Sequence, residues 1–225
     1  RPMAETHTRA APGSFEECLD AFIRRGFDPE TIIDVGVATG TPHLYERFPD
    51  AYYILVEPLS HWQSNIDAHL RRLRGEHLKC AAGDAAQRAE IRVPRGARPG
   101  GANLVHDYRA EDVETAEDIE IVRLDEAITP ARLGRHTLLK TDCQGFDGRA
   151  IMGSEGLLPA VAMIIAETSF NLPSGQISVL EVAPMLYRFG FTLAAVSPMS
   201  VNRNGIGTQC DLVFVNKALF NPWAA

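Results

Sequence analysis

Two glycines and two carboxylates mark the first stretch of the chain whose residues could bind a ligand. Asp34 lies near the end of an apolar run, and Gly36 and Gly40 follow it. Glu57 ends a second apolar run roughly 20 residues after Asp34, the distance at which nucleotide-binding α/β folds present a carboxylate to ribose hydroxyls. Glycine lets the backbone turn tightly and approach a ligand closely. The spacing therefore predicts a site for a ligand that carries a ribose.

Further polar groups follow later apolar runs. Asp142 comes directly after the run 137–141, at the carboxyl end of an expected strand, where open α/β sheets bind their ligands. Asp84 follows Gly83 and is either a ligand contact or a turn residue. His106 and Tyr108 lie beyond an irregular stretch rich in Pro, Gly and Arg. His106 is the best candidate for a general base, and the alternative is a solvated loop histidine.

Other charged residues near Asp142 have more than one interpretation. Lys140 is expected to pair with Asp142 or Glu167, and Glu167 either supports the site or contacts an acceptor. Asp142, Asp147 and Glu167 carry oxygen ligands of the kind that Mg²⁺ binds, but nothing in their spacing requires a metal. We therefore predict no metal site. His43 either faces the site or lies on the surface.

Strands alternating with helices are expected to position these groups. Short apolar runs bounded by glycine suit strands that are buried on both faces, and their alternation with helices indicates a parallel α/β sheet. Expected strands are Thr31–Val35, Tyr52–Glu57, His77–Ala82, Glu90–Val93, Ile119–Leu124, Thr137–Thr141, Val161–Thr168, Phe191–Val196 and Asp211–Asn216. Expected helices are Phe15–Arg25, Pro42–Arg47, Ser60–Arg74, Asp125–Leu133, Gly148–Leu158 and Ile177–Phe189, the last interrupted at Pro184.

The ends of the chain refine this layout. No helix is expected between the last two strands, so they must pair antiparallel as a C-terminal hairpin. The acidic stretch Glu111–Glu120 is expected to be solvated, and residues 1–13 to be a disordered or cloning-derived tail. Residues 14–225 are expected to form one domain, because no linker or repeat divides them.

Composition excludes several classes of partner. The 225 residues are 45% hydrophobic and carry a net charge of −7, with no stripe of Lys and Arg, which argues against a nucleic-acid binder. No apolar run is long enough to span a membrane. The four cysteines form no CxxC pair, which favours a reducing, cytoplasmic location. We expect a small-molecule partner, and a homodimer stays open.

The glycine motif alone does not identify the ligand. A dinucleotide-binding dehydrogenase normally has Gly-x-Gly-x-x-Gly, but here Val37, Ala38 and Thr39 follow Gly36, so the middle glycine is missing. An acidic strand end suits a ligand with a free ribose and a cationic amino-acid part. S-adenosylmethionine is such a ligand.

Several segments together resemble the FkbM family of S-adenosylmethionine-dependent methyltransferases. They are Ile33–Gly40, Val56–Pro58, Val122–Glu126, Leu138–Asp147, Ile151–Glu155, Ala166–Thr168 and Asp211–Val215. The resemblance covers roughly residues 31–216 and implies a Rossmann-like class I methyltransferase fold. In that fold a mostly parallel seven-stranded sheet ends in an antiparallel hairpin. Gln144 and Asp147 depart from the family pattern, which usually has Glu at both positions.

The resemblance also implies an activity and roles for the residues. The activity is methyl transfer from S-adenosylmethionine to a hydroxyl of a small molecule, such as a sugar or a natural product. Asp34, Gly36 and Gly40 would hold the methionine and ribose end of the cofactor, Glu57 its ribose hydroxyls, and Asp84 its adenine amine. Asp142 would border both cofactor and acceptor, with His106 and Tyr108 beside the reacting hydroxyl.

Two rival functions stay open at this stage. One is a nicotinamide-dependent Rossmann oxidoreductase, which the glycine motif alone also allows. The other is a catalytically inactive, S-adenosylmethionine-binding regulator, since Gln144 cannot act as a base where the family has a carboxylate.

Overall fold

The longest continuous apolar runs of the chain form the centre of the sheet. The computed structural model describes residues 15–94, 113–172 and 176–224. Within them, β1 (Thr31–Val35) pairs in parallel with β2 (Tyr52–Val56) and with β7 (Thr137–Thr141). All five residues of β1 and of β7 are buried. Such strands need cover on both faces, which explains why their apolar residues do not alternate with polar ones.

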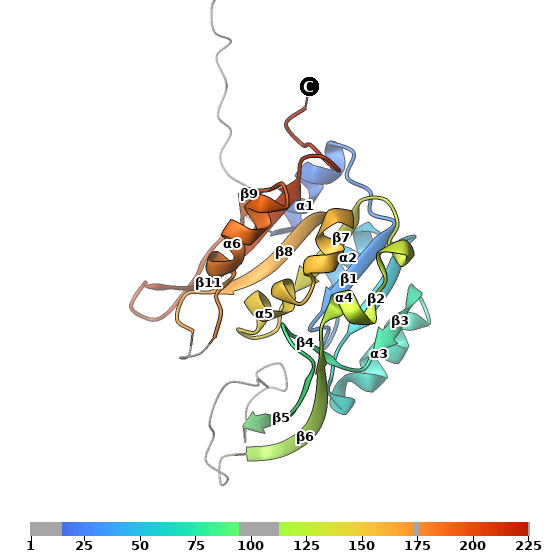
Figure 1. The fold of residues 1–225 in the computed structure, drawn as a ribbon. Helices are drawn as coiled ribbons and strands as arrows, with labels where there is room; N and C mark the ends of the chain where they lie inside the picture. The colour runs from blue at the N-terminus through green and yellow to red at the C-terminus, as the bar shows by residue number, and fades with distance from the viewer. Residues whose placement is uncertain (1–14, 95–112, 173–175, 225) are drawn as a thin grey trace, which may run out of the picture.

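The remaining strands extend this sheet in both directions. They are β3 (Arg74–Leu78), β8 (Val161–Ser169), β9 (Phe191–Val196), β10 (Ser200–Val201) and β11 (Gly207–Asn216). The order is β10-β11-β8-β7-β1-β2-β3, and β9 also pairs with β11 (Figure 1). Since β8 occupies one edge of β11, β9 and β10 share the other edge, which gives seven positions across the sheet. β11 runs antiparallel to both β8 and β9. The predicted α/β fold, with a mostly parallel sheet and an antiparallel C-terminal hairpin, is confirmed.

Helices cover both faces of this sheet. They are α1 (Phe15–Arg24), α2 (Pro42–Arg47), α3 (Gln63–Leu70), α4 (Leu124–Ala127), α5 (Asp147–Met152) and α6 (Val179–Arg188). Side chains of α1, α2 and α3 pack on one face, and those of α4, α5 and α6 pack on the other. Ile32 and Ile33 of β1 accordingly belong to different cores. Of the described helices, none has the length and apolar character needed to cross a membrane.

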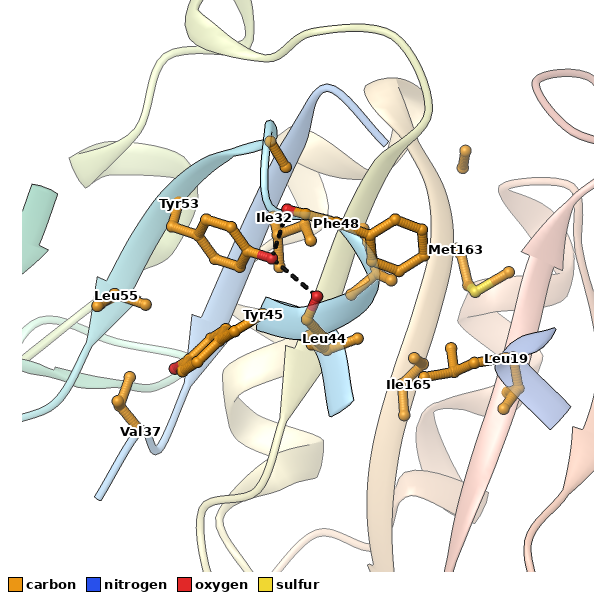
Figure 2. Close-up of a cluster of buried hydrophobic side chains, with 14 of the residues drawn as sticks. Leu19, Ile32, Val37, Leu44, Tyr45, Phe48, Tyr53, Leu55, Met163 and Ile165 are labelled. Carbon is orange, nitrogen blue, oxygen red and sulfur yellow. Dashed lines mark hydrogen bonds between the residues drawn. The ribbon is translucent and has the colours of Figure 1, made fainter. Parts of the chain in front are cut away.

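A buried tyrosine fastens α2 to the sheet. The hydroxyl of Tyr53 in β2 donates to the carbonyl oxygens of Leu44 and Phe48, at 3.0 and 2.9 Å (Figure 2). Leu44 lies in the last turn of α2 and Phe48 is its C-cap residue, and each carbonyl also accepts a backbone N–H, from Phe48 and Ala51 respectively. A six-residue helix is marginal alone, so this contact and the burial of Leu44 hold it in place.

A second, smaller sheet departs from the expected layout. It consists of β4 (Ala81–Ala82), β5 (Gln87–Pro94) and β6 (Val113–Val122) in the order β4-β6-β5. β5 and β6 form an antiparallel ribbon that extends away from the central sheet (Figure 1). Residues 113–118 lie in β6, where no strand was predicted, but Thr115, Ala116, Asp118 and Glu120 are exposed, as predicted for a solvated segment. Ile119 is buried while Asp118 and Glu120 are exposed, an alternation that a half-buried strand produces.

Several predicted boundaries are also wrong. The helix expected over Ser60–Arg74 is a 3₁₀ turn (Ser60–Trp62) followed by α3, and Arg74 already begins β3. The strand expected at His77–Ala82 is divided between β3 and β4, which belong to different sheets. α4 and α5 end early, at Ala127 and Met152, and each is followed by a 3₁₀ segment that contains a proline. Pro184, by contrast, lies within α6.

Candidate functional site

The topology of the central sheet indicates where a ligand should bind. From β1 the chain builds the sheet outward to β2 and β3, and then returns to β7 on the other side of β1. The order of the strands therefore reverses direction between β1 and β7, which makes this pair a topological switch point. Open α/β sheets bind their ligands just beyond the carboxyl ends of the strands at such a point. A cavity of about 200 Å³ lies there, bordered by Val35 and Gly36 after β1 and by Asp142 after β7.

The cavity combines an apolar slot with a few polar groups. Trp62, Ile91 and Phe146 are nearly buried and form part of its wall. The charged or amide side chains among the lining residues are Glu57, Asp142 and Gln144. The remaining lining residues are small or apolar: Val35, Gly36, Ala38, Val56, Pro58, Leu59, Cys80, Ala81, Ala82 and Cys143. Such a lining suits a ligand with a flat ring and a few hydrogen-bonding groups.

Gly36 permits the contact between the two sides of the switch point. Its φ is +79°, and its N–H donates to the Val56 carbonyl at 2.9 Å. A Cβ at this position would lie 1.9 Å from the backbone oxygen of Asp142. Gly40, with φ +106°, is similarly confined, because a Cβ there would lie 2.3 Å from His69 Nε2. The glycines are therefore required by close packing, and Gly36 lines the cavity whereas Gly40 does not.

Glu57 is held rigidly at the cavity wall. Its two carboxylate oxygens accept from the N–H groups of Ala38 and Leu59, both at 3.0 Å. Burial raises its pKa, although the two amide hydrogen bonds and nearby positive charge act in the opposite direction. Each carboxylate oxygen can accept a second hydrogen bond. Glu57 can therefore still receive hydroxyl groups of a ligand.

Asp34 lies beneath the glycine turn and not in the cavity. It is fully buried and accepts from Tyr45 Oη at 2.7 Å and from Thr41 Oγ1 at 3.2 Å. Lys140 Nζ lies 3.4 Å from Asp34 Oδ1, the oxygen that also accepts from Thr41. Asp34 therefore links β1, the start of α2 and β7, and it orders the turn that Gly36 begins.

The other predicted residues are divided between the cavity and its surroundings. Asp142 lines the cavity, but Asp84 does not, and its carboxylate pairs with Arg149 at 2.7 Å. His106 and Tyr108 lie outside the described residues. His43 pairs with Glu16 of α1 at 3.0 Å and is largely exposed.

Asp142 stands where the cavity meets a row of acidic side chains. Its side chain is 38% exposed, and Oδ1 accepts from Gln144 Nε2 at 3.0 Å. Lys140 Nζ lies 3.6 Å from Oδ2. Gln144 adopts φ +51°, an uncommon conformation for a residue with a side chain, and it places its amide over Asp142. These contacts fix the carboxylate at the edge of the cavity.

Three further carboxyl groups lie near Asp142. Glu167 in β8 is directly opposite Asp211 in β11, and Asp147 begins α5. Burial, followed by the charge of neighbouring carboxylates, raises the pKa of Glu167 to about 8 and that of Asp147 to about 6. Burial also raises the pKa of Asp211. Across the described ranges, no group of three or more His, Cys, Asp or Glu side chains is arranged to hold a metal ion.

Sequence reasoning missed the apolar part of the site. Trp62 was expected only as one member of a helical stripe, and Ile91 only as part of a short strand. Phe146 lies within the segment that resembles the FkbM family, but its side chain gave no separate signal. The one available hint was a large aromatic residue within about five residues of Glu57 or Asp142, in the segment that follows each strand end.

Comparisons with known proteins find only distant similarity. No family model and no curated protein matches the chain. Among solved structures it is similar to magnesium protoporphyrin IX methyltransferase from Synechocystis PCC 6803 with bound SAM, with 11% identity and a TM-score of 0.46, over 89% of this chain and 79% of that one. It is also similar to the 1,6-didemethyltoxoflavin-N1-methyltransferase of Burkholderia thailandensis with bound 1,6-didemethyltoxoflavin and S-adenosylhomocysteine. The identity is 10% and the TM-score 0.43, over 89% of this chain and 76% of that one. We therefore base the functional assignment on this chain's own residues.

Proposed function

We propose that this chain is an S-adenosylmethionine-dependent methyltransferase that acts on a hydroxyl group of a small molecule. The observation that carries the proposal is Glu57, a carboxylate at the carboxyl end of β2 that borders the switch-point cavity beside the glycine turn. The resemblance of several segments to the FkbM family supports the same activity. A sugar or a natural-product alcohol is the proposed acceptor.

The residues around the cavity suit this cofactor. Glu57 would accept from the ribose hydroxyls, and the slot formed by Trp62, Ile91 and Phe146 would receive the adenine ring. Asp142 supplies negative charge at the other side of the cavity, which suits a ligand whose amino-acid end is cationic. When bound, the cofactor supplies an electrophilic methyl group.

The chain's own contribution would be positioning and proton transfer. Alignment of acceptor and methyl group accounts for much of the catalysis in such a reaction. Asp142 is fixed by Lys140 and Gln144, and its exposed oxygens can accept the hydrogen of an acceptor hydroxyl. His106 and Tyr108 stay proposed as further acid–base groups.

The charge around Asp142 restricts the acceptor. Glu167 and Asp211 lie beyond it on the same side of the sheet, and Lys140 is the basic group that pairs with Asp142 there. An anionic acceptor would be repelled by the negative charge on Asp142. We therefore propose a neutral or cationic acceptor that presents a hydroxyl.

The oxidoreductase rival fits the site less well. A bound dinucleotide places its pyrophosphate on free N–H groups of the glycine turn and at the start of the next helix. Here the Ala38 N–H is bound to Glu57, and α2 has six residues and begins with a proline. In the dinucleotide fold the second half of the sheet repeats the parallel first half. In this chain the antiparallel β11 lies between β8 and β9.

The inactive-regulator rival is disfavoured by the surroundings of Asp142. That function predicts a closed or apolar cavity beside this residue. Asp142 instead is partly exposed, borders the cavity and keeps a carboxylate with a hydrogen-bonding neighbour. Turnover with a panel of sugar and alcohol acceptors, measured as release of S-adenosylhomocysteine, separates the two functions.

Glu57→Ala is expected to weaken the binding of S-adenosylhomocysteine by roughly 10- to 100-fold, because hydrogen bonds to a charged group contribute about 1.5–3 kcal/mol. Isothermal titration calorimetry measures the change. Glu46→Ala, at an exposed glutamate of α2, is the matched control and should bind like the wild type. Equal affinity of the Glu57→Ala and wild-type proteins would remove the cofactor assignment.

Ligand binding should change the fluorescence of Trp62. The chain has two tryptophans, and Trp223 is 53% exposed while Trp62 lines the cavity. In the Trp223→Phe variant, S-adenosylhomocysteine is expected to quench the emission of Trp62, and NAD(H) is expected to leave it unchanged at equal concentration. Quenching by NAD(H) alone would favour the oxidoreductase.

A further inference from the structure

Two carboxyl groups from adjacent strands meet at the edge of the cavity. β7 and β8 are parallel, and Thr141 is paired with Ala166. The next residues, Asp142 and Glu167, are therefore neighbours across the ladder, and the charge of Asp142 acts on the Glu167 carboxyl. Two neighbouring carboxyl groups can form a hydrogen bond with each other only when one of them carries a proton.

The surroundings indicate which of the two holds the proton. Glu167 is partly buried, and its Oε1 accepts from Gln209 Nε2 at 2.6 Å. The charged groups facing it are Asp142, Asp147 in α5 and Asp211 in β11, all of them acidic. The side chain of Asp142 is 38% exposed, and it has Lys140 and Gln144 as positive or donating neighbours. The negative charge therefore belongs on Asp142 and the proton on Glu167.

We propose that Asp142 and Glu167 act as one proton-sharing carboxyl pair in the proposed methyl transfer. Asp142 is the member that receives the proton of the acceptor hydroxyl. Glu167 is a positioning residue that must stay protonated to donate to Asp142. The inference rests on the proposed function, and it adds a group that acts without lining the cavity itself. Other enzymes use paired carboxyls with one shared proton as a base.

The proton balance of the step is simple. A lone pair of the acceptor oxygen forms the new bond to the methyl carbon, and the carbon–sulfur bond breaks with its electrons left on sulfur. The hydroxyl proton passes to Asp142, so that the pair briefly holds two protons. One of them then leaves to water through the exposed side of Asp142.

This pairing also accounts for the glutamine at position 144. Gln144 Nε2 donates to Asp142 Oδ1, the role of an amide and not of a carboxylate. A glutamate at 144 would place a second negative charge beside Asp142. Gln144 therefore suits a site whose base is Asp142 supported by Glu167.

Glu167→Gln tests the proposal, because an amide has the shape and bonding of a protonated carboxyl. It can accept from Gln209 and donate to Asp142, but it cannot ionise. We expect kcat at pH 7 to stay within about threefold of the wild type, while Glu167→Ala loses roughly 100-fold. The wild type should lose activity as the pH rises through about 8, and Glu167→Gln should not. Glu126→Gln, at an exposed glutamate, should keep the wild-type profile.

Two results would overturn the proposal. A 100-fold loss in Glu167→Gln at pH 7 would mean that an ionised Glu167 is needed. A decline above pH 8 that persists in this variant would assign that limb of the profile to another group.

A second readout needs neither cofactor nor turnover. Glu167 has a folded-state pKa above its ordinary 4.5, so its contribution to stability is full below that value and is lost as the pH rises to about 8. Urea unfolding of the wild type and of Glu126→Gln should show this fall between pH 6 and 8, above the raised pKa of Asp147, and Glu167→Gln should lack it in that range. Identical curves for all three proteins would overturn the shared proton. If stability falls with pH as expected but the protein does not bind S-adenosylhomocysteine, the shared proton stands and only the proposed function is contradicted.

Discussion

Replacing Gly36 with alanine is expected to destabilise the protein by roughly 2–5 kcal/mol. A Cβ there would lie 1.9 Å from the Asp142 carbonyl oxygen, a backbone atom that β7 and the Val35 contact hold in place. Overpacking of this kind costs about 1–3 kcal/mol, and a left-handed backbone costs a further 1–2 kcal/mol for a residue with a side chain. The change also pushes apart the carboxyl ends of β1 and β7, beyond which the cavity lies. Urea unfolding measures the loss.

Gly26 provides a control that separates clash from backbone strain. Its φ is +87°, close to that of Gly36, but no atom lies within 4 Å of the position of a Cβ. Gly26→Ala should therefore cost only the strain, about 1–2 kcal/mol. If both variants lose the same stability, the contact between Gly36 and Asp142 does not constrain the fold as we argue.

Replacing Lys140 with methionine is expected to cost about 3–5 kcal/mol, since removal of one partner leaves a buried charge unpaired. Asp34 is fully buried, and the side chain of Lys140 is 11% exposed. Desolvation opposes the charged form of Lys140, but attraction to Asp34 and Asp142 outweighs it and raises the pKa. Because the raised pKa keeps Lys140 charged well above neutrality, the cost should be constant between pH 6 and 8.

Two further variants check that the pair itself is responsible. Lys79→Met removes an exposed lysine that pairs with Glu117 at 3.7 Å, and should cost less than about 1 kcal/mol. In the Asp34→Asn background, Lys140→Met should cost about 1–3 kcal/mol less than in the wild type. An equal cost in both backgrounds would show that Lys140 acts through packing alone.

The central strands could be predicted because burial on both faces imposes a continuous apolar run. Thr31–Val35 and Thr137–Thr141 are strands with the predicted bounds. A capped helix with one apolar stripe is similarly clear, and α1 differs from its prediction by one residue at the end. In these segments local pattern and tertiary environment agree.

Polar strands could not be recognised in the same way. β3 (Arg74–Leu78) is partly exposed, and its Arg-Gly-Glu-His composition is typical of a helix end or a turn. β6 carries four acidic residues in ten, and only its partner β5 and the core beneath Ile119 make it a strand. The sequence shows neither the partner nor the core.

The site was predictable where polar groups close buried strands. Glu57 and Asp142 need partners, and the switch point of the sheet brings them to one cavity. Asp34 also lies near the end of a buried strand, but its carboxylate does not reach the cavity. It accepts a hydrogen bond from Tyr45 and forms an ion pair with Lys140. Trp62 and Phe146 could not be found, because an apolar residue that lines a cavity has the same chemistry as one that fills a core.

The β5–β6 ribbon has a consequence for how this protein could acquire new ligands. It supplies Ile91 to the cavity but belongs to a different sheet from the strands that carry Glu57 and Asp142. Glu117 of β6 holds it against the 3₁₀ turn by accepting from Ser60 N at 3.0 Å and from Ser60 Oγ at 2.6 Å. The ribbon can therefore vary in sequence while the register of the central strands is kept. Under mutational drift or laboratory selection, the part of the cavity that the ribbon supplies can therefore change while the strand ends that carry Glu57 and Asp142 stay the same.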